Sequence, residues 1–219
     1  MSTIADLAER FSALYTGALT DVLDRHGYLQ QTLSTELVPL RAGIRLAGPV
    51  YPVLGRPHPG HAYDASIRLI LEMLGSVPAG YVAVYETNDR QAAHFGELSA
   101  TSLASRGCAG AVIDGGTRDA QFILREDFPV FARYVTPQDC VPRWELLGHG
   151  DVTIVVGGVR VAPGDWIVGD WDGLVVVPGA RVEDVLSEAE EKAETENEIR
   201  EAVRRGTHPL AAYERYGTF

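Results

Sequence analysis

The hydrophobic pattern at the start of the chain has a helical period. Apolar residues recur three and four positions apart, at Ile4, Leu7, Ala8, Phe11 and Leu14. A second helical segment, GALTDVLDRHG, follows and stops at Gly27, a residue that commonly ends helices. We therefore expect residues 1–27 to form a helical N-terminal layer.

Residues 44–86 change from strand to helix and back to strand. IRLAGPVYPVL predicts a β-strand, and Pro49 and Pro52 predict that this strand lies at a sheet edge or carries a bulge. Asp64 is a candidate N-cap for the helix ASIRLILEML, and Gly75 is a candidate residue for its end. The apolar segment YVAVYE then predicts the next strand.

The stretch GELSATSLASRGCAGAVIDGGTRD, residues 96–119, has the densest pattern. It predicts a helix that ends at Gly107, the strand GAVID, and a turn at Gly115 and Gly116. Thr117 would then cap a helix with Arg118 and Asp119 in its first turn. This alternation predicts neighbouring parallel strands, whose carboxyl ends and helix N-termini gather ligand-binding groups at one sheet edge.

The remainder of the chain reads as strands followed by a long helix. PVFARY predicts a strand, and an irregular stretch runs to Gly150. A compact β layer follows, with turns at residues 157–158 and 172–173. Residues 180–219 predict a charged helical extension, which could reach a neighbouring subunit or pack back on its own sheet. We expect one α/β domain over residues 1–219.

Composition restricts the classes of partner. The chain has 219 residues and a formal net charge of −11, with 19 Lys and Arg against 30 Asp and Glu. An extended nucleic-acid surface needs clustered basic residues, so we expect no nucleic-acid binding, although small anions can still bind locally. No apolar run approaches membrane length and the first residues do not resemble a signal peptide, so a cytoplasmic location is expected. Cys108 and Cys140 predict buried free thiols.

Two features of the sequence narrow the kinds of catalysis to consider. The single lysine, Lys192, lies in the charged helical segment EAEEKAETENE, which we expect to be solvated. A Schiff-base lysine needs a dry pocket, so covalent amine catalysis is disfavoured. His58 and His61 have an H-x-x-H spacing, but the surrounding Pro and Gly exclude a helix and no third ligand is near, which argues against zinc.

Arg118 and Asp119 are the strongest candidate site residues. An Arg fork matches a carboxylate, and an Asp in a pocket is a hard oxygen ligand suited to Mg²⁺. The free backbone N–H groups at Gly96 to Ala100 could hold the same carboxylate. An Arg-Asp pair in a first helical turn is more often a solvated pair, so this motif alone leaves both readings open.

The same residues carry a family resemblance. Glu97, twenty intervening residues and then Arg118-Asp119, together with PVFAR and GGVRVAPGDWIVGDWDGLVVVP, resemble the family of class II 4-hydroxy-4-methyl-2-oxoglutarate aldolases and the regulator of ribonuclease activity A. The resemblance implies a compact layered α/β/α domain similar to the swivelling phosphohistidine-type β/β/α fold. It also implies a homotrimer, or two stacked trimers forming a homohexamer, with sites between subunits.

The resemblance also implies roles for individual residues. Asp119 would ligate Mg²⁺, Mn²⁺ or another divalent cation, with Glu97 acting through water. Arg118 and the backbone around Gly96, Leu98, Ser99 and Ala100 would bind a pyruvate-like 2-oxo acid. An acid from the C-terminal helix of the adjacent subunit would complete the water shell. Glu196 is our choice for that acid, and Glu194 and Glu198 are its near alternatives.

Three functions then compete. The first is a metal-dependent lyase that cleaves a C–C bond in a 2-oxo dicarboxylic acid through a pyruvate enolate, by retro-aldol cleavage or oxaloacetate decarboxylation. The second is a non-catalytic regulator that binds ribonuclease E or another protein. The third, a methyltransferase, is disfavoured because no Gly-rich nucleotide loop follows a first strand. One departure from the family concerns Phe122, which stands where aldolases often carry an acid. His94 could replace a proton donor, although a lone His ahead of a helix is more often an orienting or packed residue.

Overall fold

The structure is a computed structural model that describes residues 2–60 and 62–219. A curled sheet runs through the centre in the order β1-β6-β5-β3-β2-β10-β11, with β4 beside β5 and β7 beside β2. Its strands are β1 (Val38–Pro39), β2 (Leu46–Pro57), β3 (Val82–Glu86), β4 (Ala93–Phe95), β5 (Gly110–Thr117), β6 (Val130–Val135), β7 (Trp144–His149), β10 (Trp166–Gly169) and β11 (Leu174–Val177). A separate ribbon pairs β8 (Ile154–Val156) with β9 (Val159–Val161).

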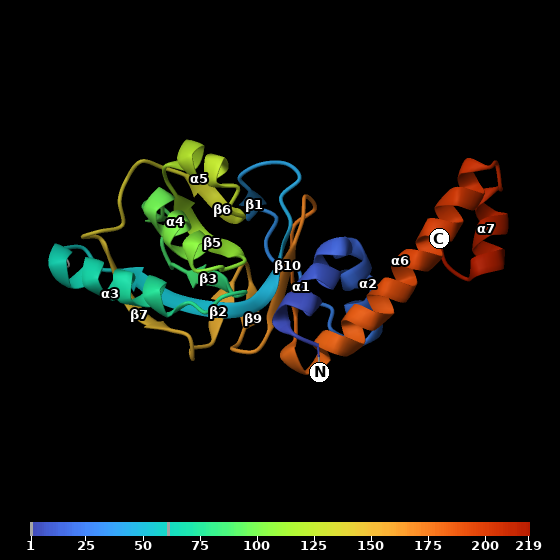
Figure 1. Ribbon diagram of the computed structural model, residues 1–219, viewed down its shortest axis with the longest axis horizontal. Helices are drawn as coiled ribbons and strands as arrows, with labels where there is room; N and C mark the ends of the chain where they lie inside the picture. The colour runs from blue at the N-terminus through green and yellow to red at the C-terminus, as the bar shows by residue number, and fades with distance from the viewer. Residues whose placement is uncertain (1, 61) are drawn as a thin grey trace.

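The helices are α1 (Ile4–Ala13), α2 (Thr16–Arg25), α3 (Tyr63–Ser76), α4 (Glu97–Ser105), α5 (Ala120–Glu126), α6 (Val182–Arg204) and α7 (Pro209–Tyr216), with a short 3₁₀ turn, η1 (Gly179–Arg181), before α6. Helices α3, α4 and α5 lie over one face of this sheet, and the terminal helices extend beyond one end of it (Figure 1). The mixed α/β class with N- and C-terminal helices is confirmed. Within the described residues, no helix is both long enough and apolar enough to cross a membrane.

The sheet is covered differently on its two faces. Helices α3, α4 and α5 contribute Met73, Leu103 and Ile123 to one buried cluster with inward residues of β3 and β5. On the opposite face, the β8–β9 ribbon contributes Ile154 and Val161 to a second cluster. The layers over the central strands are therefore helix, sheet and β ribbon, which corresponds to the β/β/α arrangement that the family resemblance implied.

Parallel pairing in the middle of the sheet follows the predicted alternation. β3 pairs in parallel with both β2 and β5, and β5 pairs in parallel with β6. All eight residues of β5 are buried, as expected for a strand covered on both faces. The carboxyl ends of β3, β5 and β6 therefore meet at one edge of the sheet.

Of the two alternatives predicted for β2, an edge position or a bulge, the structure shows the bulge, because strands pair with β2 on both sides. Residues 46–49 pair with β10, and residues 53–57 pair with β7 on the same side of β2. Pro49 stands at the end of the first pairing and Pro52 lies in the gap between the two, so each proline occurs where a missing N–H costs least. The predicted bulge is present, as a register shift between Leu54 and Gly55.

Local differences from the sequence prediction have simple causes. The N-cap of α3 is Ala62 rather than Asp64, and Asp64 in the first turn pairs with Arg68. Gly75 lies inside α3 and does not end it. The segment before Gly150, predicted as irregular, contains β7. Its sequence WELLGH lacks the strict alternation that marks a strand.

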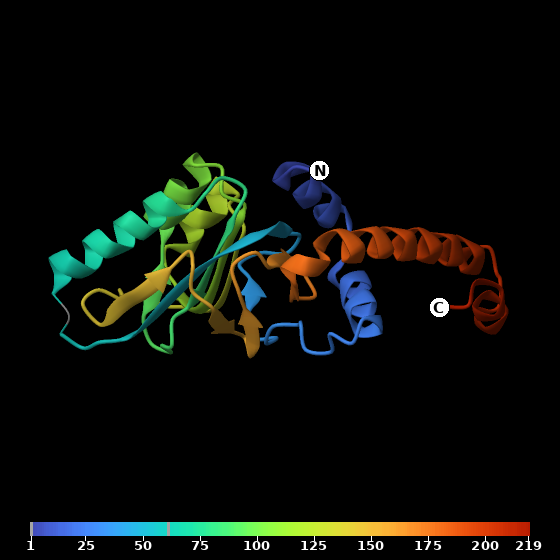
Figure 2. The same cartoon turned by 90° about the horizontal axis from the view of Figure 1, so that it is seen from below.

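The terminal helices form a second body at one end of the sheet. Phe11, Leu19 and Trp166 pack with Val185 and Leu186 in a third buried cluster that joins α1, α2, β10 and the first half of α6. The second half of α6 and α7 extend away from the sheet in both views (Figures 1 and 2). The expected N- and C-terminal helices are thus both present.

Candidate functional site

A short parallel pairing joins the two halves of the predicted site. Phe95 of β4 pairs with Thr117 of β5, and the Phe95 carbonyl accepts hydrogen bonds from the Arg118 N–H at 2.9 Å and the Thr117 hydroxyl at 3.0 Å. Gly96, the N-cap of α4, follows Phe95 directly. This pairing places the start of α4 beside Arg118 and Asp119, although about twenty residues separate them in sequence.

Asp119 has an unusual backbone. It is the N-cap of α5, with φ 56° and ψ 28° in the left-handed region, so it precedes the helix rather than lying in its first turn as predicted. β5 also continues through Gly115 and Gly116, where the sequence predicted a turn. A Cβ on Gly96 would lie 2.9 Å from the Asp119 Oδ2 atom, so a side chain at position 96 would displace that carboxylate.

Arg118 contacts two carboxylates. Its Nη1 atom lies 3.2 Å from Oδ2 of Asp139, and its Nε atom lies 3.4 Å from Oδ2 of Asp119. Sequence reasoning missed Asp139, because it lies in the stretch read as irregular and no motif marks it. Side chains of Arg118 and Asp119 remain more than a third exposed, so both groups are accessible to a small ligand.

The start of α4 supplies backbone donors. The Ala100 N–H donates to the Gly96 carbonyl at 3.0 Å, which makes it the first intrahelical bond of α4. The prediction that the Ala100 amide holds substrate therefore does not fit, since that donor is already used. Leu98 and Ser99 lie in the first turn, where amide groups have no intrahelical acceptor, and they remain candidates.

A cavity of about 530 Å³ contains these groups. Its polar side is formed by Gly96, Glu97, Ser99, Arg118, Asp119 and Asp139. Its other side is apolar and comes mainly from α3, with Leu98 and Phe122 facing it from α4 and α5. The cavity thus combines one guanidinium group, several carboxylates and an apolar wall.

The polar side fits a hard divalent cation in donor type. Glu97 and Asp119 offer carboxylate oxygens, and Mg²⁺ typically takes one or two carboxylates and keeps several waters. Among the described residues, no three His, Cys, Asp or Glu side chains form a ready metal cluster. A single chain therefore offers a partial set of ligands, which water, substrate or another subunit would have to complete.

His94 lies under the cavity as a packed, neutral residue. Its side chain is fully buried, its ring meets Trp144 edge-on at 5.2 Å, and neither ring nitrogen has a hydrogen-bond partner among the described residues. Nε2 lies 3.2 Å from the Asp89 carboxylate. Burial outweighs this carboxylate and lowers the pKa of His94 to about 4. A neutral imidazole at pH 7 does not suit the role of proton donor.

Glu196 lies away from this cavity in the same chain. It accepts a hydrogen bond from the Tyr15 hydroxyl, and Lys192 lies 2.8 Å from its carboxylate. Helix α6, which carries it, is at the opposite end of the molecule from α4 and α5 (Figure 1). Glu196 could therefore reach a site like this one only in another copy of the chain.

Lys192 is paired and not solvated, contrary to the prediction. Its ammonium group also lies 3.0 Å from Asp21, and the side chain is 14% exposed. The hydrogen bond with Glu196 contributes most to a raised pKa of Lys192. A firmly protonated amine is a poor nucleophile, which strengthens the case against Schiff-base chemistry.

The other sequence candidates do not add reactive groups to the cavity. His58 contacts Glu145 through Nδ1 at 2.8 Å, and His61 lies outside the described residues. Cys108 and Cys140 are buried free thiols, as predicted. Burial raises the pKa of Cys140 to about 12, so this thiol is inert although it touches the cavity.

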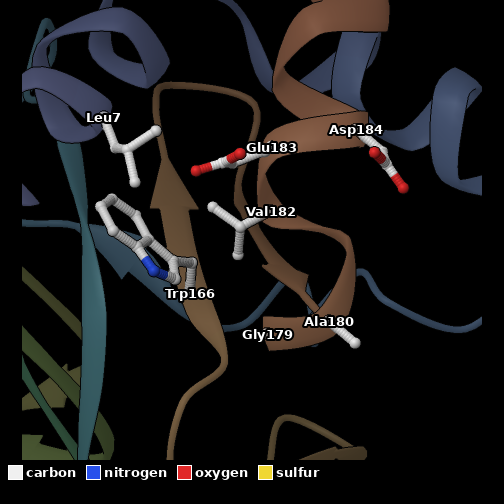
Figure 3. A pocket seen from close by; sticks show the side chains of 7 residues that line it. All are labelled: Leu7, Trp166, Gly179, Ala180, Val182, Glu183 and Asp184. Carbon is white, nitrogen blue, oxygen red and sulfur yellow. The ribbon is translucent and has the colours of Figure 1, made fainter. Parts of the chain in front are cut away.

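A second hollow between α1 and the start of α6 has different chemistry (Figure 3). Leu7, Trp166 and Val182 line it, and Glu183 points over them while Asp184 points away. None of the described residues that line it is basic, so an anionic substrate would have no counter-charge from them. The cavity at Arg118 is the better candidate site.

Comparison with known proteins decides the family. A sequence profile described as RraA-like, Aldolase/RraA, matches residues 16–176, about three quarters of the chain. The chain belongs to the RraA-like family. This confirms the resemblance inferred from Glu97, Arg118 and Asp119.

Individual relatives of this RraA-like chain carry different names. A Halalkalibacterium halodurans protein named "Putative 4-hydroxy-4-methyl-2-oxoglutarate aldolase" is 29% identical over 196 residues, which cover 90% of this chain and 87% of the relative. Streptomyces coelicolor RraAS2, described as an unusual member of the RNase ES inhibitor RraA protein family, has a TM-score of 0.80 at 25% identity, covering 89% and 96% of the two chains.

A third relative has a solved structure described as novel cellulases from microbes associated with the gut ecosystem. It has a TM-score of 0.84 at 31% identity, covering 90% of this chain and 88% of that one. These names do not agree on one activity. Membership of the family therefore establishes the fold, whereas the function has to be inferred from the residues of the cavity.

Proposed function

We propose that this protein is a divalent-metal-dependent lyase that cleaves a C–C bond in a 2-oxo acid and releases pyruvate. The observation that supports this most directly is the contact among Gly96, Arg118 and Asp119, where one cation and one exposed carboxylate share a cavity. Names of relatives that refer to an aldolase agree with this proposal.

Each residue would have a distinct task. Arg118 would hold the substrate carboxylate, assisted by the amide groups of Leu98 and Ser99 at the N-terminus of α4. Asp119 would ligate Mg²⁺ or Mn²⁺, with Glu97 acting through water. When bound, the cation would supply Lewis acidity that stabilises negative charge on the 2-oxo oxygen. Glu196 of an adjacent subunit would complete the water shell.

The reaction needs no covalent link to the protein. In retro-aldol cleavage the C4 hydroxyl loses its proton, the C3–C4 bond breaks, and its electron pair forms the pyruvate enolate as C4 becomes a carbonyl. A proton then adds to C3. Decarboxylation of oxaloacetate reaches the same enolate with CO₂ as the leaving group. Either route is consistent with a chain whose one lysine is paired far from the cavity.

Two measurements test the proposal. Purified protein with Mg²⁺ should release pyruvate from 4-hydroxy-4-methyl-2-oxoglutarate or oxaloacetate, and EDTA should abolish the release. It should also exchange the methyl hydrogens of pyruvate with deuterium from solvent, because exchange reports the enolate directly. Absence of both reactions with Mg²⁺ and Mn²⁺ would rule out the lyase.

A second candidate is a regulator that binds a ribonuclease or another protein. The similarity to RraAS2, a member of the RNase ES inhibitor RraA protein family, favours this function. The net charge of −11 allows an acidic docking surface. A pull-down with ribonuclease E at physiological salt tests this reading. Retention of binding by the Arg118→Ala, Asp119→Ala double variant would support a docking surface separate from the cavity.

A further inference from the structure

One helix presents an apolar stripe to the candidate cavity. Tyr63, Ile67, Ile70, Leu71 and Leu74 all line it, at spacings of four, three, one and three residues along α3. These intervals place them on one helical face. Leu74 is buried in the core, whereas Tyr63 and Leu71 are 61% and 59% exposed, so the stripe continues from the core into the open cavity.

Two apolar side chains from the polar side of the cavity also face it. Leu98, in the first turn of α4, is 78% exposed, and Phe122 of α5 is 44% exposed. The Arg125 guanidinium lies over the Phe122 ring, 5.1 Å from its centre, and does not line the cavity. Three helices thus expose apolar surface beside the carboxylate-binding residues.

Charge limits what can occupy the apolar part. Among the described residues of one chain that line the cavity, Arg118 is the one Arg or Lys, and it shares the site with Glu97, Asp119 and Asp139. One guanidinium can pair with one substrate carboxylate. A second carboxylate at the far end would lie against Ile67, Ile70 and Phe122, where it would lose water without gaining a partner.

We propose that the substrate is a 2-oxo acid with one carboxylate and an apolar group at its far end, such as a branched alkyl or aromatic group on C4 of a 4-hydroxy-2-oxo acid. The C1 carboxylate would bind at Arg118, and the apolar group would lie along α3. This inference rests on the proposed function and narrows it. Cleavage would give pyruvate and an apolar aldehyde or ketone, with the same bonds broken and formed as described above.

A pair of non-cleavable analogues tests the inference by binding alone. 6-Methyl-2-oxoheptanoate and 2-oxoadipate have similar shapes, but the first ends in an isopropyl group where the second has a carboxylate. Calorimetry on the full-length protein with Mg²⁺ should give a Kd at least about tenfold lower for the apolar compound. Equal binding, or tighter binding of 2-oxoadipate, would overturn the proposal.

Substitutions in α3 locate the effect. Ile67→Lys should shift the ratio of the two Kd values at least about tenfold toward 2-oxoadipate, because it supplies a second cation. Leu69→Lys is the matched control: Leu69 is 42% exposed on the same helix but does not line the cavity, so the ratio should stay unchanged. If Ile67→Lys does not fold, Leu71→Lys serves at an exposed position. An unchanged ratio in the folded variant would contradict the proposed location.

Pyruvate exchange separates this inference from the proposed function. If the wild-type protein exchanges the methyl hydrogens of pyruvate but prefers 2-oxoadipate, the lyase stands and the apolar-substrate inference fails. If it exchanges no hydrogens yet binds the isopropyl compound more tightly, the inference about the ligand stands and the lyase fails.

Discussion

At the scale of single residues, Asp119 combines a left-handed backbone with a position in the cavity. A non-Gly residue in the left-handed region costs roughly 1–2 kcal/mol, although Asp and Asn tolerate it better than most. Here that backbone turns the Asp119 carboxylate toward Gly96, within reach of Arg118. Strain of this kind commonly occurs where a functional group must be held in place.

Replacement of Asp119 tests this interpretation directly. Asp119→Asn keeps a residue that tolerates the left-handed backbone but removes the negative charge. We expect metal-dependent pyruvate exchange to fall by about 100-fold or more, with the Tm changed by no more than about 2 °C. Asp127→Asn is the control, because Asp127 has φ 55° at the other end of α5 and lies outside the cavity. Exchange within threefold of wild type in Asp119→Asn would contradict a metal-ligand role.

His94 should make stability depend on pH. Its pKa is lowered by burial from 6.5 to about 4, so the unfolded chain binds more protons between these values. Neutral His94 therefore contributes its full stabilisation above pH 6.5. As the pH falls toward 4, up to about 3 kcal/mol of the free energy of unfolding is lost. Urea unfolding of wild type and His94→Gln at pH 7 and pH 4.5 measures this. The difference between the two proteins should change with pH, and parallel curves would contradict the assignment.

At the scale of elements, the sequence predicted best where pattern and local chemistry agree. Helix α4 and the parallel strands β3, β5 and β6 follow from apolar periodicity and from Gly at the helix ends. Gly115 and Gly116 misled the prediction because they were read as a turn. Both lie within β5, where a Cβ would meet Thr87 and Tyr134 at 2.5 and 2.4 Å. Glycine here permits close packing, a tertiary cause that single-sequence patterns do not contain.

Gly55 shows the same principle at the bulge of β2. A Cβ at this position would lie 1.9 Å from the Trp144 ring, whose Nε1 donates to the Thr87 carbonyl and fixes the indole. Gly55→Ala should therefore destabilise the protein by about 2–3 kcal/mol. Gly75→Ala, at an open position within α3, should instead stabilise it by about 0.5–1 kcal/mol. Urea denaturation distinguishes these opposite signs, and a neutral Gly55→Ala would contradict the packing argument.

At the scale of the whole molecule, part of the candidate site could be predicted from one sequence and part could not. Glu97, Arg118 and Asp119 do line one cavity, because β4 and β5 bring together two motifs that the sequence had singled out. Asp139 and the stripe on α3 were missed, since neither belongs to a motif. The role of Glu196 at the site could not be predicted from one sequence, because helical periodicity does not say which subunit a residue faces.

Mixing two variants of low activity tests whether neighbouring subunits contribute residues to the same site. Asp119→Asn and Glu196→Gln should each reduce pyruvate exchange. If each site takes Asp119 from one subunit and Glu196 from the next, equal amounts unfolded and refolded together should regain about a quarter of wild-type activity, because random assembly restores that fraction of sites. Each variant refolded alone is the control. Activity no higher than the mean of the two variants would show that the site is not shared in this way.

The pairing of β2 also has a consequence during synthesis on the ribosome. Leu46 to Pro49 pair with Trp166 to Gly169, more than a hundred residues later in the chain. At ordinary translation rates the first part of β2 therefore waits on the order of ten seconds for its partner. During that interval β3, β5 and β6 are made, but the apolar strand edge at residues 46–49 stays open. Nascent chains halted before residue 166 should thus be the forms that most need chaperones.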